Sequence, residues 1–164
     1  MSSAAHQTVI RHYDPETDLD SLRQCIVEQQ DYHRSLEPSW PEGVAIADEY
    51  LEYLDTQCKL HDGQIFVAEI AGELAGFACV AASNQGEAPD DPALFAWIYD
   101  IFVTAAHRRQ RVASALMAEV ESFARAHGAT QLRLGVLARN EHARRFYDGQ
   151  GFHEYVSVLA KSLA

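Results

Sequence analysis

The sequence predicts an α/β (α+β) domain in which a mixed central sheet is flanked by helices on both faces. Three observations indicate this class. Apolar residues recur at helical spacing in some segments and alternate or run together in others. These segments follow one another in the order β-α-α-β-β-β-α-β-α-β, with no repeat or linker between them. The length of 164 residues and an apolar fraction of 48% suit a single domain over residues 1–164.

The first half of the chain predicts a strand, two helices and a hairpin. Asp14-Pro15 is expected to close the strand as a turn, and Asp18 to cap the first helix. The stretch Ser35–Glu42, which contains two prolines, is expected to be a loop, and Ala71-Gly72 is a short hairpin signal. The expected elements are strands within Gln7–Tyr13 and over Gln64–Ile70 and Glu73–Ala82, and helices over Asp18–His33 and from Ile46 to about His61.

The second half predicts three strands and two helices after a polar loop over Ser83–Pro92. A long apolar run interrupted by Asp100 indicates a central buried strand. Gly128 is typical of a residue that follows a helix, and Asn140 of one that caps the next. The expected elements are strands over Leu94–Val103, Gln131–Leu137 and Phe152–Leu159, and helices from about Arg111 to Gly128 and from Asn140 to Tyr147.

Charge is distributed unevenly along the chain, whose formal net charge is −11. Residues 14–62 carry 13 acidic against 3 basic residues, and residues 63–104 carry 6 acidic residues and no Lys or Arg. Residues 105–164 reverse this balance, with 9 basic against 5 acidic residues. Two ligands of opposite charge would explain the split, although solvated faces explain most such biases. The acidic majority argues against nucleic-acid binding, which needs a basic footprint.

No segment predicts membrane insertion, export or metal binding. The longest apolar run, Ala93–Tyr99, is too short to span a bilayer, and the polar N-terminus lacks a signal-peptide core. The three cysteines have no metal-binding spacing, as expected for reduced thiols, and the eight histidines form no HExxH or paired motif. We therefore expect a cytoplasmic protein with no membrane partner and no metal.

A basic turn between the central strand and the third helix is the first candidate site. It reads Arg108-Arg109-Gln110-Arg111-Val112-Ala113-Ser114. The backbone N–H groups of a first helical turn lack partners and lie at the positive end of the helix dipole, so such a turn binds pyrophosphate readily. Taken alone, a helix start with solvated arginines explains the turn better.

A second motif, Asn140 to Phe152, changes that balance. Together with the basic turn it resembles the GNAT superfamily of N-acetyltransferases, whose signatures are Q/R-x-x-G-x-G/A after a strand and N-x-x-A-x-x-F/L-Y-x-x-x-G-F. The resemblance covers about residues 8–161 and implies a mostly antiparallel sheet. The matching residues are Arg108 and Ala113 in the first signature and Asn140, Ala143, Phe146, Tyr147, Gly151 and Phe152 in the second.

The sequence departs from the family pattern at two places. Arg111 stands where the family usually has glycine, and it either strains the turn or reaches a phosphate itself. We expect an ordinary helical φ for Arg111 and hence a phosphate contact or no effect. Only about a dozen residues follow Gly151-Phe152, which leaves open a missing last strand, or one supplied by a partner in a homodimer.

The resemblance implies transfer of an acetyl group from acetyl-CoA to a primary amine by direct attack on the thioester. It assigns the pyrophosphate to backbone amides of the turn, the thioester carbonyl to a backbone N–H near Ile101–Val103, and the pantetheine arm to Asn140. Tyr147 matches the tyrosine that donates a proton to the leaving thiolate. The implied coenzyme contacts are Ile101, Phe102, Val103, Arg108, Arg109, Gln110, Arg111, Val112, Ala113, Ser114, Asn140, Ala143 and Tyr147.

The sequence leaves three candidates for the general base: Asp100, its neighbour Tyr99, and water. Asp100 interrupts an apolar strand beside the implied thioester site, and burial would raise its pKa and suit it to accept a proton. An Asp that faces solvent or pairs with an arginine explains it equally well. A bulge could exchange which of Tyr99 and Asp100 faces the site.

The acceptor is expected to be a small cationic amine or an amine of a protein or peptide. The family's first two helices form the acceptor wall, which makes Tyr32, His33, Glu37 and Trp40 candidate contacts. Two other classes remain open beside an enzyme. One is a non-catalytic acyl-CoA-binding or sensing module, and the other is a homodimeric structural domain with an empty turn.

Overall fold

The computed structural model describes residues 7–85, 91 and 93–163. Two long helices follow a short first strand, and a hairpin, a third strand and two further helices complete the order of elements. The elements are β1 (Val9–His12), α1 (Leu19–Leu36), α2 (Gly43–Leu60), β2 (Gln64–Ile70), β3 (Glu73–Gln85), β4 (Leu94–Val103), a short 3-10 turn (Ala105–His107), α3 (Val112–Ala126), β5 (Gln131–Leu134) and α4 (Glu141–Gly149).

The strands form one five-stranded sheet in the order β1-β2-β3-β4-β5. Each neighbouring pair is antiparallel except β4 and β5, which are parallel. Ala71 and Gly72, both at positive φ, turn β2 into β3, as a two-residue hairpin requires. The predicted mixed, mostly antiparallel sheet is therefore confirmed.

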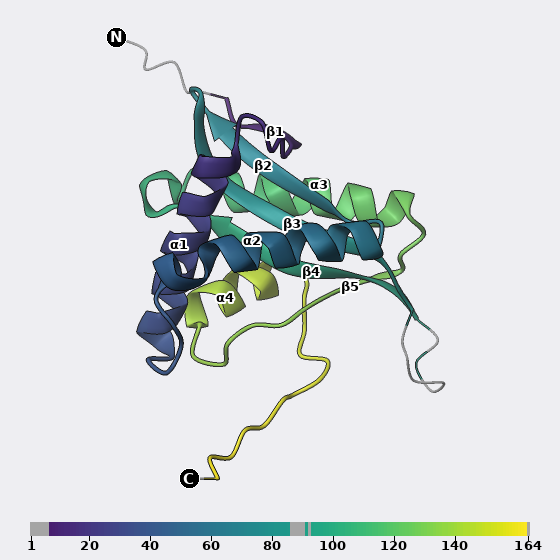
Figure 1. The fold of residues 1–164 in the computed structure, drawn as a ribbon. Coiled ribbons are helices and arrows are strands. Elements are labelled where there is room, and N and C mark those ends of the chain that lie inside the picture. The colour runs from purple at the N-terminus through teal and green to yellow at the C-terminus, as the bar shows by residue number, and fades with distance from the viewer. Residues whose placement is uncertain (1–6, 86–90, 92, 164) are drawn as a thin grey trace.

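Helices cover both faces of this sheet (Figure 1). On one face, α3 packs through Leu116 and Val120 on Phe66 and Val80 of the sheet. On the other, α1 and α2 form a second apolar cluster with the sheet, which includes Leu22, Leu54 and Phe77. The two-sided arrangement predicted from the alternation of helices and strands is confirmed.

A bulge in β4 determines which side chains face α1 and α2. Ile98 pairs with Val80 and Asp100 pairs with Cys79, so Tyr99 is an extra residue between two consecutive pairs. Ile98 packs on the α3 side, whereas Tyr99 packs on the α1 and α2 side and Asp100 bonds to both of those helices. The bulge therefore brings two successive side chains to the same face.

The expected last strand, Phe152–Leu159, is wrong. Residues 152–163 form neither strand nor helix and extend away from the body of the fold (Figure 1). Val156 and Val158 are 73% and 92% exposed, whereas Phe152 packs on the apolar core and Tyr155 reaches back to Arg133 of β5. β-branched residues favour an extended backbone, but a strand needs a hydrogen-bonded neighbour, and β5 is only four residues long.

Several expected boundaries also shift. Asp18 is the N-cap residue of α1, as expected, but its side chain makes no capping bond, because its carboxylate binds the guanidinium of Arg11 at 2.6 and 2.9 Å and the backbone N of Asp14. α1 continues to Leu36, so the loop expected over 35–42 starts two residues later. β3 runs to Gln85, and most of the expected loop over Ser83–Pro92 lies outside the described residues. β5 ends at Leu134 rather than at Leu137.

Candidate active site

The turn before α3 has an unusual backbone. Arg109 and Arg111 both adopt the left-handed conformation, with φ of 63° and 62°. The expected ordinary helical φ at Arg111 is therefore wrong. Arg111 is the N-cap of α3, and the chain reaches the helix there through the conformation that glycine adopts most easily.

The start of α3 leaves backbone donors available. The first bond inside the helix runs from the N–H of Ala115 to the carbonyl of Arg111, so the amides of residues 112–114 precede it. Arg111 provides no side-chain cap. Ser114 and all three arginines of the turn are exposed, which gives this helix start the donors and the positive charge that bind an anion.

The turn is linked to α1 at two points. The carboxylate of Glu28 accepts a 2.6 Å bond from the backbone N of Ala105. The guanidinium of Arg108 lies 5.5 Å from the ring centroid of Tyr32, and its Nε donates to the carbonyl of Val103. α1 therefore fixes where β4 ends and where the basic turn begins.

Asn140 caps α4, as predicted, and also contacts α1. Its Oδ1 accepts one bond from the backbone N of Ala143 and one from the hydroxyl of Tyr32, each at 3.1 Å. The residue is only 6% exposed. Both bonds involve the oxygen, so the Nδ2 group, which has no partner among the described residues, can donate to a ligand.

Asp100 is a buried carboxylate between three elements. Its two oxygens accept bonds from Nε2 of Gln29 on α1 and from the hydroxyl of Tyr50 on α2, both at 2.6 Å. Burial raises the pKa of Asp100 to about 6, although the two donors oppose that shift. Asp100 thus neither faces solvent nor pairs with an arginine, the two alternatives that its sequence position left open.

Tyr147 and Tyr99 lie near this carboxylate from different sides. Tyr147 on α4 packs against the rings of Phe146 and Phe152, and burial followed by the charge of Asp100 raises its pKa. The hydroxyl of Tyr99 donates to Oε1 of Gln57 at 2.9 Å, and burial raises the pKa of Tyr99 to about 12. Both phenols stay protonated at neutral pH.

The predicted acceptor residues separate into two groups. Tyr32 faces Asn140, and Glu37 forms a 3.6 Å ion pair with Arg139, so both reach the segment before α4. His33 packs edge-on against Trp40, which is 39% exposed. The structure therefore places the first pair beside the predicted coenzyme residues and the second at the α1–α2 connection.

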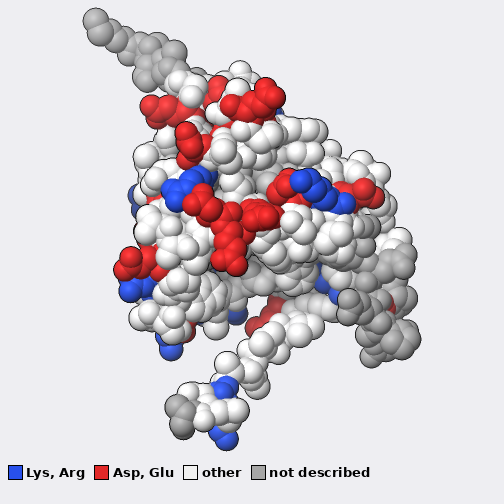
Figure 2. All heavy atoms as spheres, in the orientation of Figure 1, with Lys and Arg blue, Asp and Glu red and all other residues white. Residues whose placement is uncertain are grey.

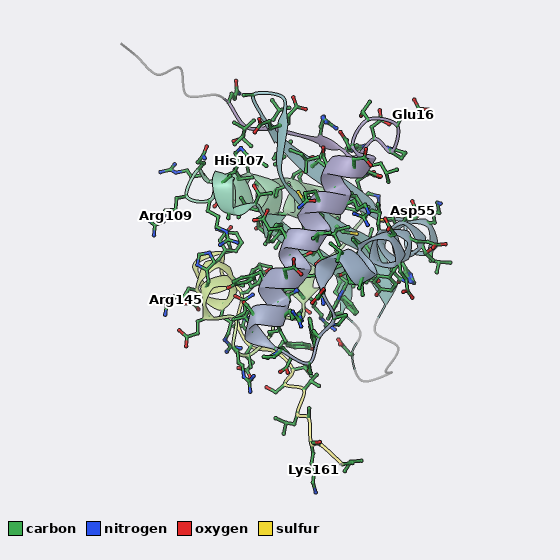
Figure 3. All side chains as sticks on the ribbon, turned by 60° about the vertical axis from the view of Figure 1, so that its left-hand side comes forward. Glu16, Asp55, His107, Arg109, Arg145 and Lys161 are labelled. Atoms are coloured by element: carbon green, nitrogen blue, oxygen red, sulfur yellow. The ribbon has the colours of Figure 1, made fainter. Side chains whose placement is uncertain are left out.

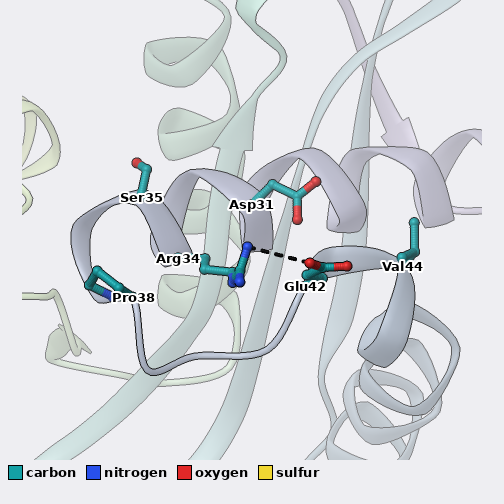
Figure 4. Close-up of a pocket in the computed structure, with 6 residues that line it drawn as sticks. All are labelled: Asp31, Arg34, Ser35, Pro38, Glu42 and Val44. Atoms are coloured by element: carbon teal, nitrogen blue, oxygen red, sulfur yellow. Dashed lines mark ion pairs between the residues drawn. The ribbon is translucent and has the colours of Figure 1, made fainter.

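A hollow of ≈ 450 Å³ lies at that same connection (Figure 4). Arg34 and Glu42 form a 3.6 Å ion pair across it, and Asp31 accepts a bond from the backbone N of Gly43. None of the residues that line it bonds to Asp100 or Asn140. The lining residues are Asp31, Arg34, Ser35, Pro38, Glu42 and Val44.

Acidic side chains predominate on one face of the molecule (Figure 2). Acidic side chains gather over α1 and α2, where Asp48, Glu49 and Glu52 are exposed (Figure 2). Figure 3 shows Arg109 and Arg145 on one side of α1 and Asp55 on the other. Basic side chains also lie on the acidic face, where Arg23 pairs with Asp48 and Lys59 with Asp55, so the charge division along the sequence is only partly a division in space.

Gln29 and Tyr50, which hold Asp100, were not among the site residues expected from the sequence. Gln29 is 5% exposed on α1, at helical spacing from the buried Cys25 and Ile26, and such a polar residue on an apolar stripe is the signal that could have identified it. Among the described residues, no group of three or more His, Cys, Asp or Glu side chains could hold a metal ion, and no helix is long and apolar enough to cross a membrane.

A protein-family model matches most of the chain. Residues 29–152 match the sequence model of the acetyltransferase (GNAT) family. A Bacillus subtilis (strain 168) protein named uncharacterized N-acetyltransferase YycN is 35% identical over 75 residues, which are 46% of this chain and 48% of that protein. The chain thus matches about half the length of that curated relative.

Solved structures share the fold. A putative acetyl transferase from Pyrococcus furiosus superposes with a TM-score of 0.69 at 22% identity, over 96% of this chain and 100% of that chain. An acetyltransferase of the GNAT family from Staphylococcus aureus Mu50 gives 0.72 at 16% identity, over 92% of this chain and 87% of that chain. At these identities the likeness shows the fold alone.

Proposed function

Because the chain belongs to the acetyltransferase (GNAT) family, we propose that it transfers an acetyl group from acetyl-CoA to a primary amine by direct attack on the thioester. The acceptor is a small cationic amine or an amine of a protein or peptide. One observation carries the proposal: Asp100 is a buried carboxylate on the strand that leads into a basic turn suited to bind an anion. The free thiols of Cys25, Cys58 and Cys79 support a cytoplasmic location.

The coenzyme is assigned to the turn and to the cap of α4. The amides of residues 109–114 would bind the pyrophosphate, and the exposed arginines would add long-range attraction. Nδ2 of Asn140 would donate to the pantetheine arm, because its oxygen is already occupied by Tyr32 and Ala143. The backbone N–H groups near Ile101–Val103 would polarise the thioester carbonyl.

The proton transfers are assigned to Asp100 and Tyr147. A primary amine with a pKa near that of lysine, about 10.4, arrives protonated and must lose a proton before it attacks. Asp100, with a pKa of about 6, takes that proton directly or through water. The new C–N bond forms as the C–S bond breaks, and the thiolate takes the proton of the Tyr147 hydroxyl. The amine nitrogen loses its second proton as it becomes the amide, and that proton restores the Tyr147 hydroxyl directly or through water.

The acceptor class rests on the charge division. The acidic side chains over α1 and α2 would attract a cationic amine toward the face on which Tyr99 and Asp100 lie. Coulomb attraction of this kind raises the rate of encounter more than the affinity of the complex. His33 and Trp40 at the α1–α2 connection, and Glu37 beside Arg139, remain proposed acceptor contacts.

An acceptor screen tests this function. The protein is mixed with acetyl-CoA and a panel of polyamines, amino sugars, amino acids and peptides, and thiol release is followed. Turnover with one amine class supports the proposal. Calorimetric binding of acetyl-CoA without turnover on any amine would instead indicate an acyl-CoA-binding module. Absence of binding would overturn both and leave a structural, homodimeric domain as the explanation.

A further inference from the structure

Two cysteines that take no part in the proposed chemistry face one another. The Sγ atoms of Cys58, near the end of α2, and Cys79, on β3, lie 3.6 Å apart, and both thiols are free. They belong to the apolar cluster between the sheet and the two long helices. Formation of a disulfide would require the sulfurs to approach to about 2.05 Å, a closure of roughly 1.5 Å.

The backbone holds this pair in register. A Cβ atom at Gly63 would lie 2.7 Å from the carbonyl oxygen of Val80 and 2.8 Å from the Cα of Cys58, so only glycine allows α2 to end this close to β3. The N–H of Gly63 donates to the carbonyl of Cys58, and the N–H of Ala82 donates to the carbonyl of His61. The two thiols therefore meet as a consequence of fixed backbone contacts.

The two thiols differ in access and acidity. Cys58 is partly exposed, and the hydrogen bond from Cys79 lowers its pKa. Cys79 is fully buried, and its pKa lies well above the usual range because of that same hydrogen bond and its burial. An oxidant from solvent therefore meets Cys58 first, and Cys79 is positioned to react second.

We propose that Cys58 and Cys79 form a redox modification site that a peroxide closes reversibly into a disulfide. The Cys58 thiolate attacks one peroxide oxygen, the O–O bond breaks, and Cys58 becomes a sulfenic acid while water or an alcohol leaves. Cys79 then attacks the sulfenic sulfur, the S–O bond breaks, and the hydroxyl leaves as water with the thiol proton. A dithiol reductant restores both thiols.

This disulfide would act close to the proposed acceptor face. Gln57, next to Cys58, accepts the hydrogen bond from the Tyr99 hydroxyl, and Cys79 is paired with Asp100 across β3 and β4. Closure draws the end of α2 toward the sheet and thus moves Gln57 relative to Tyr99. The redox site itself does not depend on the acetyltransferase proposal, because it requires only the two thiols and their fixed separation.

The test uses the purified full chain, treated with hydrogen peroxide under native conditions and then alkylated after unfolding. We expect a product that is lighter by two hydrogen atoms before alkylation, and a proteolytic fragment that links Cys58 to Cys79. Cys25, which is 3% exposed on α1, should be alkylated as before. The oxidised form should melt roughly 5–10 °C higher, and a dithiol reductant should reverse this shift.

Variants separate this outcome from general oxidation. C58S and C79A should each lose the cross-link, and C25S, the matched control, should keep it. If C79A does not fold, loss of the cross-link in C58S is the deciding result, because Cys58 is partly exposed and its substitution should leave the fold intact. The proposal is overturned if the peroxide-treated wild-type protein yields only sulfinic acid at Cys58 or only a disulfide between two chains. It is also overturned if this protein shows no oxidation under conditions that oxidise free cysteine.

Discussion

The hydroxyl of Tyr32 donates to Oδ1 of Asn140 at 3.1 Å and thereby joins α1 to the cap of α4. The same Tyr32 ring lies 5.5 Å from the guanidinium carbon of Arg108 in the basic turn. Tyr32 was expected on sequence grounds to contact the acceptor. The contacts instead place it between the two segments proposed to bind the coenzyme, where it would orient the Asn140 amide.

Tyr32→Phe should therefore weaken coenzyme binding more than acceptor binding. The change keeps the ring beside Arg108 and removes the hydroxyl that fixes Asn140. Loss of one hydrogen bond of about 1 kcal/mol corresponds to roughly a fivefold rise in the KM for acetyl-CoA. Steady-state kinetics with each substrate varied in turn would measure this. A rise in the KM for the amine alone would show that Tyr32 contacts the acceptor rather than the coenzyme site.

Tyr147→Phe should lower turnover and leave coenzyme binding intact. The substitution keeps the ring packed against Phe146 and Phe152 and removes the proposed proton donor. A positioned acid contributes on the order of 10²–10⁴-fold to the rate. Tyr53→Phe, at a tyrosine that is 43% exposed on α2, is the matched control and should keep most of the activity. An unchanged single-turnover rate in Tyr147→Phe would exclude this role.

Activity should depend on the ionisation of Asp100. If Asp100 accepts the amine proton, kcat/KM should rise with pH through about 6, where the buried carboxyl loses its own proton. Tyr50→Phe removes one donor to the carboxylate, so it should move this rise to higher pH. Asp100→Asn should abolish the rise. A wild-type profile without a step in this range would mean that another group is the base.

The ionisation of Asp100 should also make the free energy of unfolding depend on pH. The pKa of Asp100 is raised from 3.8 to about 6 by folding, so between these pH values the unfolded chain binds fewer protons than the folded one. The free energy of unfolding should therefore fall as pH rises from about 4 to about 6, by roughly 3 kcal/mol, relative to Asp100→Asn. Urea titrations of both proteins would measure it, and parallel curves would contradict the shift.

Arg111→Gly should stabilise the protein. A left-handed φ destabilises a residue with a Cβ by about 1–2 kcal/mol, and substitution by glycine removes this strain. Glycine also loses more conformational entropy on folding, which offsets about 0.5–1 kcal/mol of the gain. The net gain in the free energy of unfolding should be about 0.5–1 kcal/mol. Gln110→Gly, at a neighbour without a positive φ, should be destabilising. Denaturant midpoints would compare the two.

The same Arg111 variant reports on the coenzyme. A guanidinium that contacts phosphate contributes about 1.5–3 kcal/mol, so its removal should weaken acetyl-CoA binding measured by calorimetry. Tighter binding would instead show that backbone strain at this position limits the site.

The sequence predicted correctly those elements whose formation depends on neighbouring residues in the chain. The bounds of β2 and β4 are as expected, because alternating or continuous apolar residues between clear turn signals define a buried strand. The Asn140 cap is likewise a local feature, since the side chain bonds to a residue three positions along. The order of helices and strands predicted a mixed sheet with both faces covered, and the resemblance to the family predicted that the sheet is mostly antiparallel.

The features that the sequence did not predict depend on distant partners. The sequence predicts that the Asp18 side chain caps α1, but the guanidinium of Arg11 on β1 binds its carboxylate instead. The partners of Asp100 come from positions 71 and 50 residues away in the chain, and no local spacing relates them. The segment after α4 has the composition of a strand, yet the structure gives it no neighbour with which to pair.

The extra residue at position 99 has an evolutionary consequence. Without Tyr99, the side chains of β4 would alternate regularly and keep their present faces: Ile98 and Ile101 toward α3, and Asp100 and Phe102 toward α1 and α2. A single-codon deletion here would remove one aromatic ring from the face beside Asp100 without re-registering the strand. Deletion of Asp100 would keep the register in the same way, whereas deletion of a residue outside this pair would send every following side chain to the opposite layer. This face can therefore diversify by insertion and deletion, as well as by substitution.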